Sequence, residues 1–211
     1  EARADYEAFV RPVDVPGAVN PSEIFAWLNE RLPEDAILTN GAGNYAGWLH
    51  RFYLHKRFNT QLAPTSGAMG YGVPAAIGAK ALYPDRVVVG CAGDGCFLMN
   101  GQELATAAQY DLGVIILVFN NGMYGTIRMH QEREYPGRVI GTDLKNPDFA
   151  AYAKAFGFWS TTVRTTAAFK PAFEEALASG RPALIEIITE ADAISPTATL
   201  SGIRKAAQNK N

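Results

Sequence analysis

The sequence has few cysteines, no excess of basic residues and no long apolar run, and each shortage excludes a class of protein. Its two cysteines, Cys91 and Cys96, are too few for a disulfide framework, and we expect them to be small packing residues of a reduced, cytoplasmic protein. The 19 Lys and Arg residues against 21 Asp and Glu are scattered and leave a net charge of −2. This favours neither nucleic acid nor a membrane surface as a partner. No apolar run has the length needed to cross a bilayer.

Three regions differ in composition. The stretch 1–20 is polar and contains prolines, so we expect a linker or arm. Its start, EARADYEAFV, lacks the basic and apolar regions of a signal peptide, and the missing initiator Met favours a chain cut from a longer one. The stretch 21–190 is rich enough in apolar residues to bury one core. The stretch 191–211 has little periodicity and is expected to be a C-terminal arm or a disordered tail.

The middle of the chain alternates strand-like with helix-like segments. The apolar runs 86–93 and 113–121 are typical of strands that are buried on both faces of a parallel sheet. Further strands are predicted at 36–40, 59–64, 159–165 and 183–189, and helices at 20–32, 45–52, from about 73 to 82, and at 100–110, 146–157 and 167–180. This alternation predicts an α/β fold, a doubly wound, mostly parallel sheet with helices on both faces.

Polar residues follow the two most apolar strands. Asp94 comes after the strand at 86–93, and paired asparagines, Asn120 and Asn121, end the strand at 113–121. Parallel strands end at one edge of a sheet, so Asp94 and Asn121 would converge on one cation if the two strands are neighbours. Carboxylate and amide oxygens suit Mg²⁺. Each half alone has a plainer interpretation, because GDG is an ordinary tight turn and NN is a common helix cap.

Glycines beside Asp94 favour a diphosphate in the same place. Gly93 and Gly95 allow backbone N–H groups to approach a diphosphate closely, and the start of the following helix adds positive potential. A carboxylate would repel a diphosphate unless a cation lay between them. The pattern therefore predicts a metal ion and a diphosphate together.

GDG followed one crossover later by NN resembles the diphosphate-binding signature of thiamine diphosphate (ThDP) enzymes, specifically the acetolactate synthase and pyruvate decarboxylase group. The resemblance covers about 20–189 and implies a C-terminal diphosphate-binding (PP) domain with ThDP and Mg²⁺ as cofactors. By it, the metal ligands are the side chains of Asp94 and Asn121 and the backbone carbonyl of Met123. The cofactor-binding residues that it implies are Asn44, Gly67, Met69, Gly93, Asp94, Gly95, Cys96, Asn121, Met123 and Tyr124.

The stretch TSGAMGYGVPAAIGAK, residues 65–80, is similar to a second segment of that family. The resemblance implies that the Gly67 carbonyl accepts a hydrogen bond from the pyrimidine amino group. It also implies that Met69 holds the two rings of the cofactor in a bent conformation, a role that a polarizable thioether can fill against aromatic rings. In isolation, Met69 would be interpreted as an ordinary core residue.

The resemblance implies an acetolactate synthase-like enzyme that decarboxylates a 2-oxo acid and transfers the resulting carbanion to an acceptor. In that family a glutamate on a separate N-terminal pyrimidine-binding domain, contributed by a partner subunit, completes the site. No counterpart precedes residue 20, so we expect half an active site within a homodimer or homotetramer. The alternatives are a simple 2-oxo acid decarboxylase or aldehyde lyase, or a non-catalytic module for Mg²⁺ with phosphate or a nucleotide. A Walker loop and a full dinucleotide fingerprint are absent, which weakens the last alternative.

The sequence departs from the acetolactate synthase pattern after the metal loop. That pattern is NNxxxGMVxQWQ, whereas this chain has NNGMYGTIRMHQ, with Thr126 in place of the Met and His130 in place of the Trp. His130 is a candidate base or polar pocket residue and, with Met69, a candidate catalytic residue. Arg128 and the charges near it are expected on a solvated helix face. The aromatic residues of 45–53 are compatible with a core position or a subunit contact, and we favour the contact.

Overall fold

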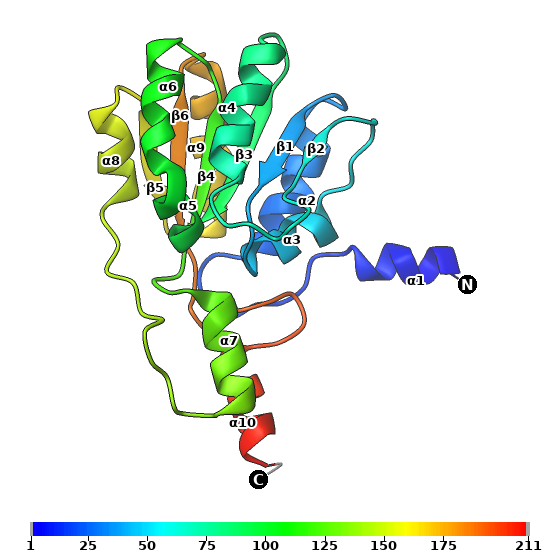
Figure 1. The fold of residues 1–211 in the computed structure, drawn as a ribbon. Coiled ribbons are helices and arrows are strands. Elements are labelled where there is room, and N and C mark those ends of the chain that lie inside the picture. The colour runs from blue at the N-terminus through cyan, green and yellow to red at the C-terminus, as the bar shows by residue number, and fades with distance from the viewer. Residues whose placement is uncertain (1, 210–211) are drawn as a thin grey trace.

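The computed structural model describes residues 2–209 and shows six parallel strands in one sheet (Figure 1). The strands are β1 (Ile37–Asn40), β2 (Gln61–Leu62), β3 (Val88–Gly93), β4 (Ile115–Asn120), β5 (Trp159–Val163) and β6 (Ala183–Ile188). Their order across the sheet is β2-β1-β3-β4-β6-β5, and every neighbouring pair is parallel. The predicted parallel α/β fold is confirmed.

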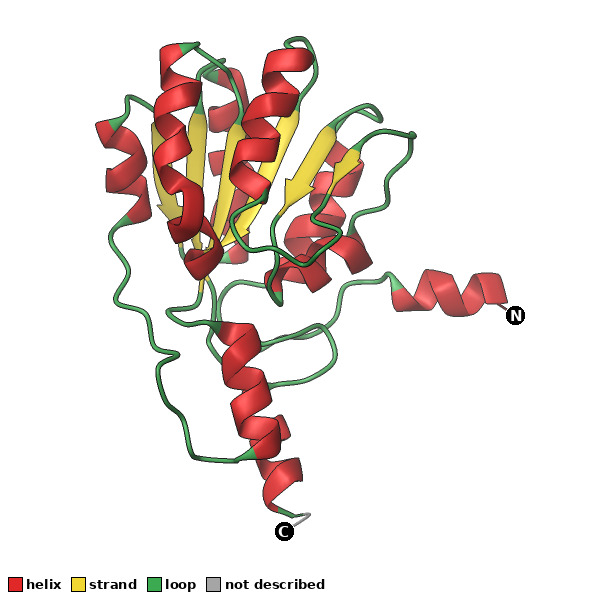
Figure 2. Ribbon diagram, viewed as in Figure 1, coloured by secondary structure: helices red, strands yellow, loops and turns green. Residues whose placement is uncertain are grey.

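Helices cover both faces of the sheet, as Figure 2 shows. The helices are α1 (Ala2–Phe9), α2 (Pro21–Arg31), α3 (Tyr45–Phe52), α4 (Gly72–Leu82), α5 (Asp94–Asn100), the 3₁₀ turn η1 (Gly101–Glu103), α6 (Leu104–Gln109), α7 (Gly125–Glu134), α8 (Phe149–Ala155), α9 (Thr166–Ala178) and α10 (Leu200–Gln208). In β4, Ile115, Leu117 and Phe119 face the core beneath α2, α3 and α9. Ile116 and Val118 face the core beneath α4, α5, α6 and α8. This alternation along one buried strand is what a doubly wound sheet requires.

Local sequence accounts for most element boundaries. The Asn20 side chain accepts a hydrogen bond from the N–H of Ser22, and Pro21 occupies the first position of α2. Asp148 caps α8 and Thr165 caps α9 through the same kind of bond. The predicted set lacks α1, α5 and α10. Of these, α5 begins at Asp94, directly after β3, because the glycine-flanked turn passes into a helix without any linker.

The expectation for the aromatic residues of 45–53 was wrong. Trp48, Phe52 and Tyr53 are only 3%, 2% and 7% exposed and belong to the core beneath α2 and α3. They are buried because α3 packs against α2 and β3, which places its aromatic face inward. His50 is also structural, since its Nε2 lies 3.0 Å from the Asn40 Oδ1.

Two segments lie outside the layered part of the molecule (Figure 1). The stretch expected to be a linker or arm carries the short helix α1, which buries no residue. As far as Asn209, the C-terminal stretch crosses beneath the sheet as an arm after β6 and ends in α10, which lies beside α7. Among residues 2–209, no helix is both long and apolar enough to span a membrane.

Candidate functional site

A cavity of about 250 Å³ lies at the carboxyl ends of the strands. It is bounded by the loop after β1, the starts of α3, α5 and α7, and the arm after β6. Every cofactor-binding residue that the sequence predicted lines it: Asn44, Gly67, Met69, Gly93, Asp94, Gly95, Cys96, Asn121, Met123 and Tyr124. The position agrees with the rule that open α/β sheets bind ligands at this edge.

Asp94 lies at the centre of the strand edge and is 3% exposed. β3 and β4 are paired neighbours, as the convergence of Asp94 and Asn121 required. The Asp94 Oδ1 accepts a hydrogen bond from the N–H of Gly95 (2.8 Å), and its Oδ2 accepts one from the N–H of Gly122 (2.9 Å). Burial raises the pKa of this carboxyl, and the hydrogen bonds from the backbone oppose that rise.

A network behind Asp94 joins the tips of three strands, and the sequence had not singled it out. The Asn146 Nδ2 donates to the Asp94 Oδ2 and to the Asn120 Oδ1, at 2.8 Å each. The Asn120 Nδ2 donates in turn to the Glu186 Oε1 on β6 (2.7 Å). Asn120 therefore supports the site from behind. Asn146 was overlooked because, in the sequence, it is only the residue before a helix-capping Pro-Asp pair.

The loop 121–125, which the sequence predicts to bind the metal and which is called the metal loop, follows β4. Gly122 has φ +72°, a left-handed conformation that favours glycine. The Asn121 Oδ1 accepts from the N–H of Met123 (3.2 Å). The loop is braced by the segment 142–144: the N–H of Tyr124 donates to the Thr142 carbonyl, and the N–H of Leu144 donates to the Gly122 carbonyl. Two backbone bonds thus hold the loop beside Asp94.

Two glycines leave the space that a diphosphate would need. A Cβ on Gly93 would lie 2.9 Å from the Tyr45 ring, and a Cβ on Gly95 would lie 2.6 Å from the Tyr124 ring. A side chain at either position would therefore collide with an aromatic wall of the cavity. Only glycine lets backbone N–H groups and aromatic rings approach the same space.

The loop before α4 forms another wall. Gly67 has φ +67°, and Met69 is 36% exposed and lines the cavity. The loop is tied to α5 by the Cys96 Sγ, which accepts from the N–H of Gly70 at 3.2 Å. Cys96 is buried, as its predicted packing role required, and both cysteines are free thiols. Met69 is thus a cavity residue and not a core residue.

Asn44 lines the cavity as predicted, whereas His130 does not. The Asn44 Oδ1 accepts from the Thr126 hydroxyl (2.9 Å), so the residue in the Met position of the acetolactate synthase pattern lies against a predicted diphosphate contact. His130 does not line the cavity. It is exposed on α7, and its Nδ1 lies 2.5 Å from the Arg133 Nη2.

The expectation that Arg128 is solvated was wrong, because its side chain donates hydrogen bonds to Thr142 and Asp143 and the residue is only 9% exposed.

The donors at this edge fit a hard divalent cation. Within residues 2–209, none of the ion pairs involves Asp94, so its buried carboxylate has no cationic partner there. A buried carboxylate without one is costly, and a bound cation would compensate for the charge. The described residues hold no cluster of three or more His, Cys, Asp and Glu that would suit a metal. The predicted ligands are instead one carboxylate, one amide and one backbone carbonyl, an oxygen set typical of Mg²⁺.

Comparison with known proteins agrees with this geometry. Residues 41–187 match the family described as "Thiamine pyrophosphate enzyme, C-terminal TPP binding domain". The chain is 36% identical over 180 residues to the acetolactate synthase large subunit of Corynebacterium glutamicum, covering 82% of this chain and 29% of that one. It is 36% identical over 158 residues to the mitochondrial acetolactate synthase catalytic subunit of Aspergillus candidus, covering 74% of this chain and 23% of the relative.

A solved structure is similar too, the thiamine diphosphate-dependent 4-hydroxybenzoylformate decarboxylase of Rhodococcus jostii RHA1. Its TM-score is 0.79 at 35% identity, and the match covers 86% of this chain and 34% of that one. The matched part of the chain thus covers only 23% to 34% of the length of these proteins. With its parallel sheet and its cavity at the ends of β3 and β4, the chain belongs to the family of C-terminal TPP-binding domains of thiamine pyrophosphate enzymes.

Proposed function

We propose that this chain holds the diphosphate end of ThDP through Mg²⁺ and contributes half of the active site of an acetolactate synthase-like enzyme. The observation that carries the proposal is the buried Asp94 carboxylate, which lies at a glycine-lined strand edge beside the Asn121 loop and has no ion-pair partner among the described residues. Asp94, Asn121 and the Met123 carbonyl would bind the metal. The N–H groups of Gly95 and Cys96, with Asn44, would bind the diphosphate.

The remaining cavity residues would orient the cofactor. The Gly67 carbonyl would accept from the pyrimidine amino group, and Met69 would separate the two rings. Gly93 and Tyr124 would line the path of the diphosphate. ThDP supplies the electron sink for the loss of CO₂ from a 2-oxo acid. The chain's own part is to anchor the cofactor, fix its conformation and keep water from the cavity behind it.

The proposal extends to a partner. In this reading, a glutamate from a pyrimidine-binding domain of a second subunit completes the site, and the active enzyme is a homodimer or homotetramer. Relatives such as the acetolactate synthase of C. glutamicum are about three times longer than the matched segment, which leaves room for such a domain. We expect the 211-residue chain alone to show no pyruvate decarboxylation even with both cofactors present. Sustained turnover by the chain alone would contradict the half-site proposal.

Calorimetric titration tests the binding itself. ThDP is titrated into the full chain with Mg²⁺ and then with EDTA, and we expect binding only with the metal. Asp94→Ala should weaken binding by more than about a hundredfold, because loss of a supporting residue alone commonly costs about 10- to 100-fold in metal affinity. Asp85→Ala is the matched control, since Asp85 is exposed at the opposite end of β3. Binding of ATP or NAD in place of ThDP would favour a nucleotide module instead.

A further inference from the structure

The arm after β6 forms part of the cavity wall. Ala193 and Ile194 line the cavity, and Ile194 is 2% exposed. Ile194 and Leu200 form a small apolar cluster with Met123, whose backbone carbonyl is a proposed metal ligand. The contact is tight, since a Cβ built on Gly125 would lie 2.9 Å from the Ile194 Cδ1. The position of the metal loop therefore depends on where the arm packs.

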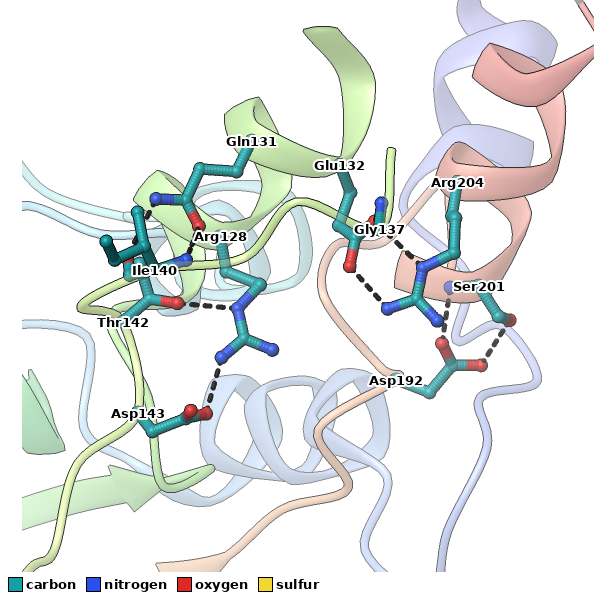
Figure 3. A network of polar contacts seen from close by, with 10 residues as sticks. All are labelled: Arg128, Gln131, Glu132, Gly137, Ile140, Thr142, Asp143, Asp192, Ser201 and Arg204. Atoms are coloured by element: carbon teal, nitrogen blue, oxygen red, sulfur yellow. Dashed lines mark hydrogen bonds and ion pairs between the residues drawn. The ribbon is translucent and has the colours of Figure 1, made fainter. Parts of the chain in front are cut away.

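An ion pair between a buried carboxylate and a partly exposed arginine holds this arm in place (Figure 3). Glu132 on α7 is 0% exposed, although it is a carboxylate that lies outside the cavity. Arg204 on α10 binds it with two donors: Nε donates to the Glu132 Oε2 at 2.8 Å, and Nη2 donates to the Oε1. The N–H of Gly137 donates to the same Oε2 at 2.9 Å. The carboxylate thus joins α7, α10 and the turn that follows α7.

Further polar contacts fix each end of the connection. The Asp192 carboxylate accepts from the N–H and the hydroxyl of Ser201, at 2.6 and 2.8 Å, which holds the start of α10 against the arm. On the other side of α7, Arg128 donates to Thr142 and Asp143 (Figure 3). Within this network, the Glu132–Arg204 pair is the polar link between the side chains of α7 and α10.

We propose that Glu132 is a positioning residue: through Arg204 it docks the arm 191–209 on α7, and the docked arm holds Ile194 and the metal loop in the geometry that retains the cofactor. This inference rests on the proposed function of the cavity. Glu132 itself does not line the cavity, so any effect on binding must pass through the arm.

The consequence of breaking the pair follows from burial. A carboxylate that loses its partner while buried is strongly unfavourable, so the arm is expected to leave α7 and let water reach Glu132. Apparent affinity falls in proportion to the fraction of molecules with the arm docked. If that fraction falls to about a tenth, the apparent Kd rises about tenfold.

The test uses three variants of the full chain. Arg204→Ala removes the donor. Arg31→Ala is the matched control, because Arg31 makes the same kind of two-donor pair with Glu174. That pair joins α2 to α9 and does not involve the arm, and the side chains of Arg31 and Glu174 are both partly exposed. The double variant Glu132→Met/Arg204→Met replaces the pair with apolar side chains, which commonly preserve packing where a buried ion pair stood. The measurements are the Kd for ThDP with Mg²⁺, thermal unfolding, and the sites of thermolysin cleavage, which mass spectrometry of the fragments identifies.

We expect Arg204→Ala to raise the Kd about tenfold or more and to open thermolysin cleavage within 191–209. Arg31→Ala should leave both unchanged, and the double variant should restore both. An unchanged Kd for Arg204→Ala would overturn the inference while leaving the proposed function intact. The inference would also be overturned if Arg31→Ala and Arg204→Ala raised the Kd equally for an equal loss of thermal stability. A rise in Kd for Arg204→Ala that the double variant fails to reverse would overturn it too. A wild-type chain that binds no ThDP would overturn both proposals.

Discussion

Two glycines of α4 should respond in opposite ways to the same substitution. A Cβ on Gly72 would lie 2.7 Å from the Cys91 carbonyl oxygen and 2.7 Å from the Gly41 nitrogen. Both are backbone atoms at the strand ends, so neither can move aside. A Cβ on Gly78, six residues further along the helix, would meet no atom within 4 Å. The pair separates a packing constraint from helix propensity on one element.

The magnitudes follow from that geometry. Gly78→Ala gains helix propensity and should stabilise the protein by about 0.5–1 kcal/mol, which raises the Tm by about 1–4 °C for a chain of this size. Gly72→Ala forces overpacking against backbone and should destabilise by about 1–3 kcal/mol, which lowers the Tm by about 2–12 °C. The Gly72 carbonyl also accepts from the Thr39 hydroxyl at 2.6 Å, and a shift of α4 would strain that bond.

Thermal and urea unfolding of both variants beside the wild type would measure these changes. Gly41, which Gly72 contacts, directly precedes Ala42 in the cavity wall. Gly72→Ala should therefore also weaken ThDP binding, whereas Gly78→Ala should leave it unchanged. If Gly72→Ala proved as stable as the wild type, the close approach of α4 to the ends of β1 and β3 would be refuted. Equal destabilisation by the two variants would show instead that helix geometry, and not contact with the strands, decides the result.

Two further predictions concern the supports of the site. Asn146→Ala should raise the Kd for ThDP with Mg²⁺ about 10- to 100-fold, because the Asn146 Nδ2 orients Asp94 and Asn120. Calorimetric titration of this variant beside the exposed control Lys145→Ala measures the change, and equal affinities of the two variants would contradict the prediction. The hydrogen bond from Arg204 holds the pKa of Glu132 below its ordinary value of 4.5, and Arg128 adds to this. The stabilisation that this pair gives to the docked arm should therefore be complete above pH 4.5, and it should be lost as the pH falls through the lower folded-state pKa of Glu132. Hydrogen exchange of residues 191–209 measured against pH would follow this loss. Glu132→Gln should remove that pH dependence, and an unchanged profile in this variant would count against the assignment.

Much of the site could be predicted because its parts are local in sequence. The GDG turn directly follows one buried strand and the NN pair ends another, and parallel strands bring such ends to one edge. Whether β3 and β4 are neighbours is a long-range fact, and the structure confirms it. Asn146 could not be predicted in the same way, because it reaches Asp94 from 52 residues further along the chain.

The errors have physical causes as well. An aromatic helix such as α3 is equally compatible with a subunit contact and with a core, and only its packing against α2 and the sheet decides for the core. Arg128 and Glu132 have the sequence appearance of a solvated helix face, yet α10 and the segment 137–143 cover them. Helical periodicity records which side of a helix is apolar, and it does not record which polar side chains a distant segment will bury.

By itself, the sequence determined the alternation of strands and helices and the buried character of β3 and β4, and it predicted the residues for a metal and a diphosphate, because these depend on residue type and on near neighbours. Only the tertiary structure decided that Asn146 clamps Asp94, that His130 lies outside the cavity, and that Glu132 and Arg204 bind the C-terminal arm to α7. Those facts depend on which distant segments meet, and contacts between distant segments are set by the packing of the whole chain.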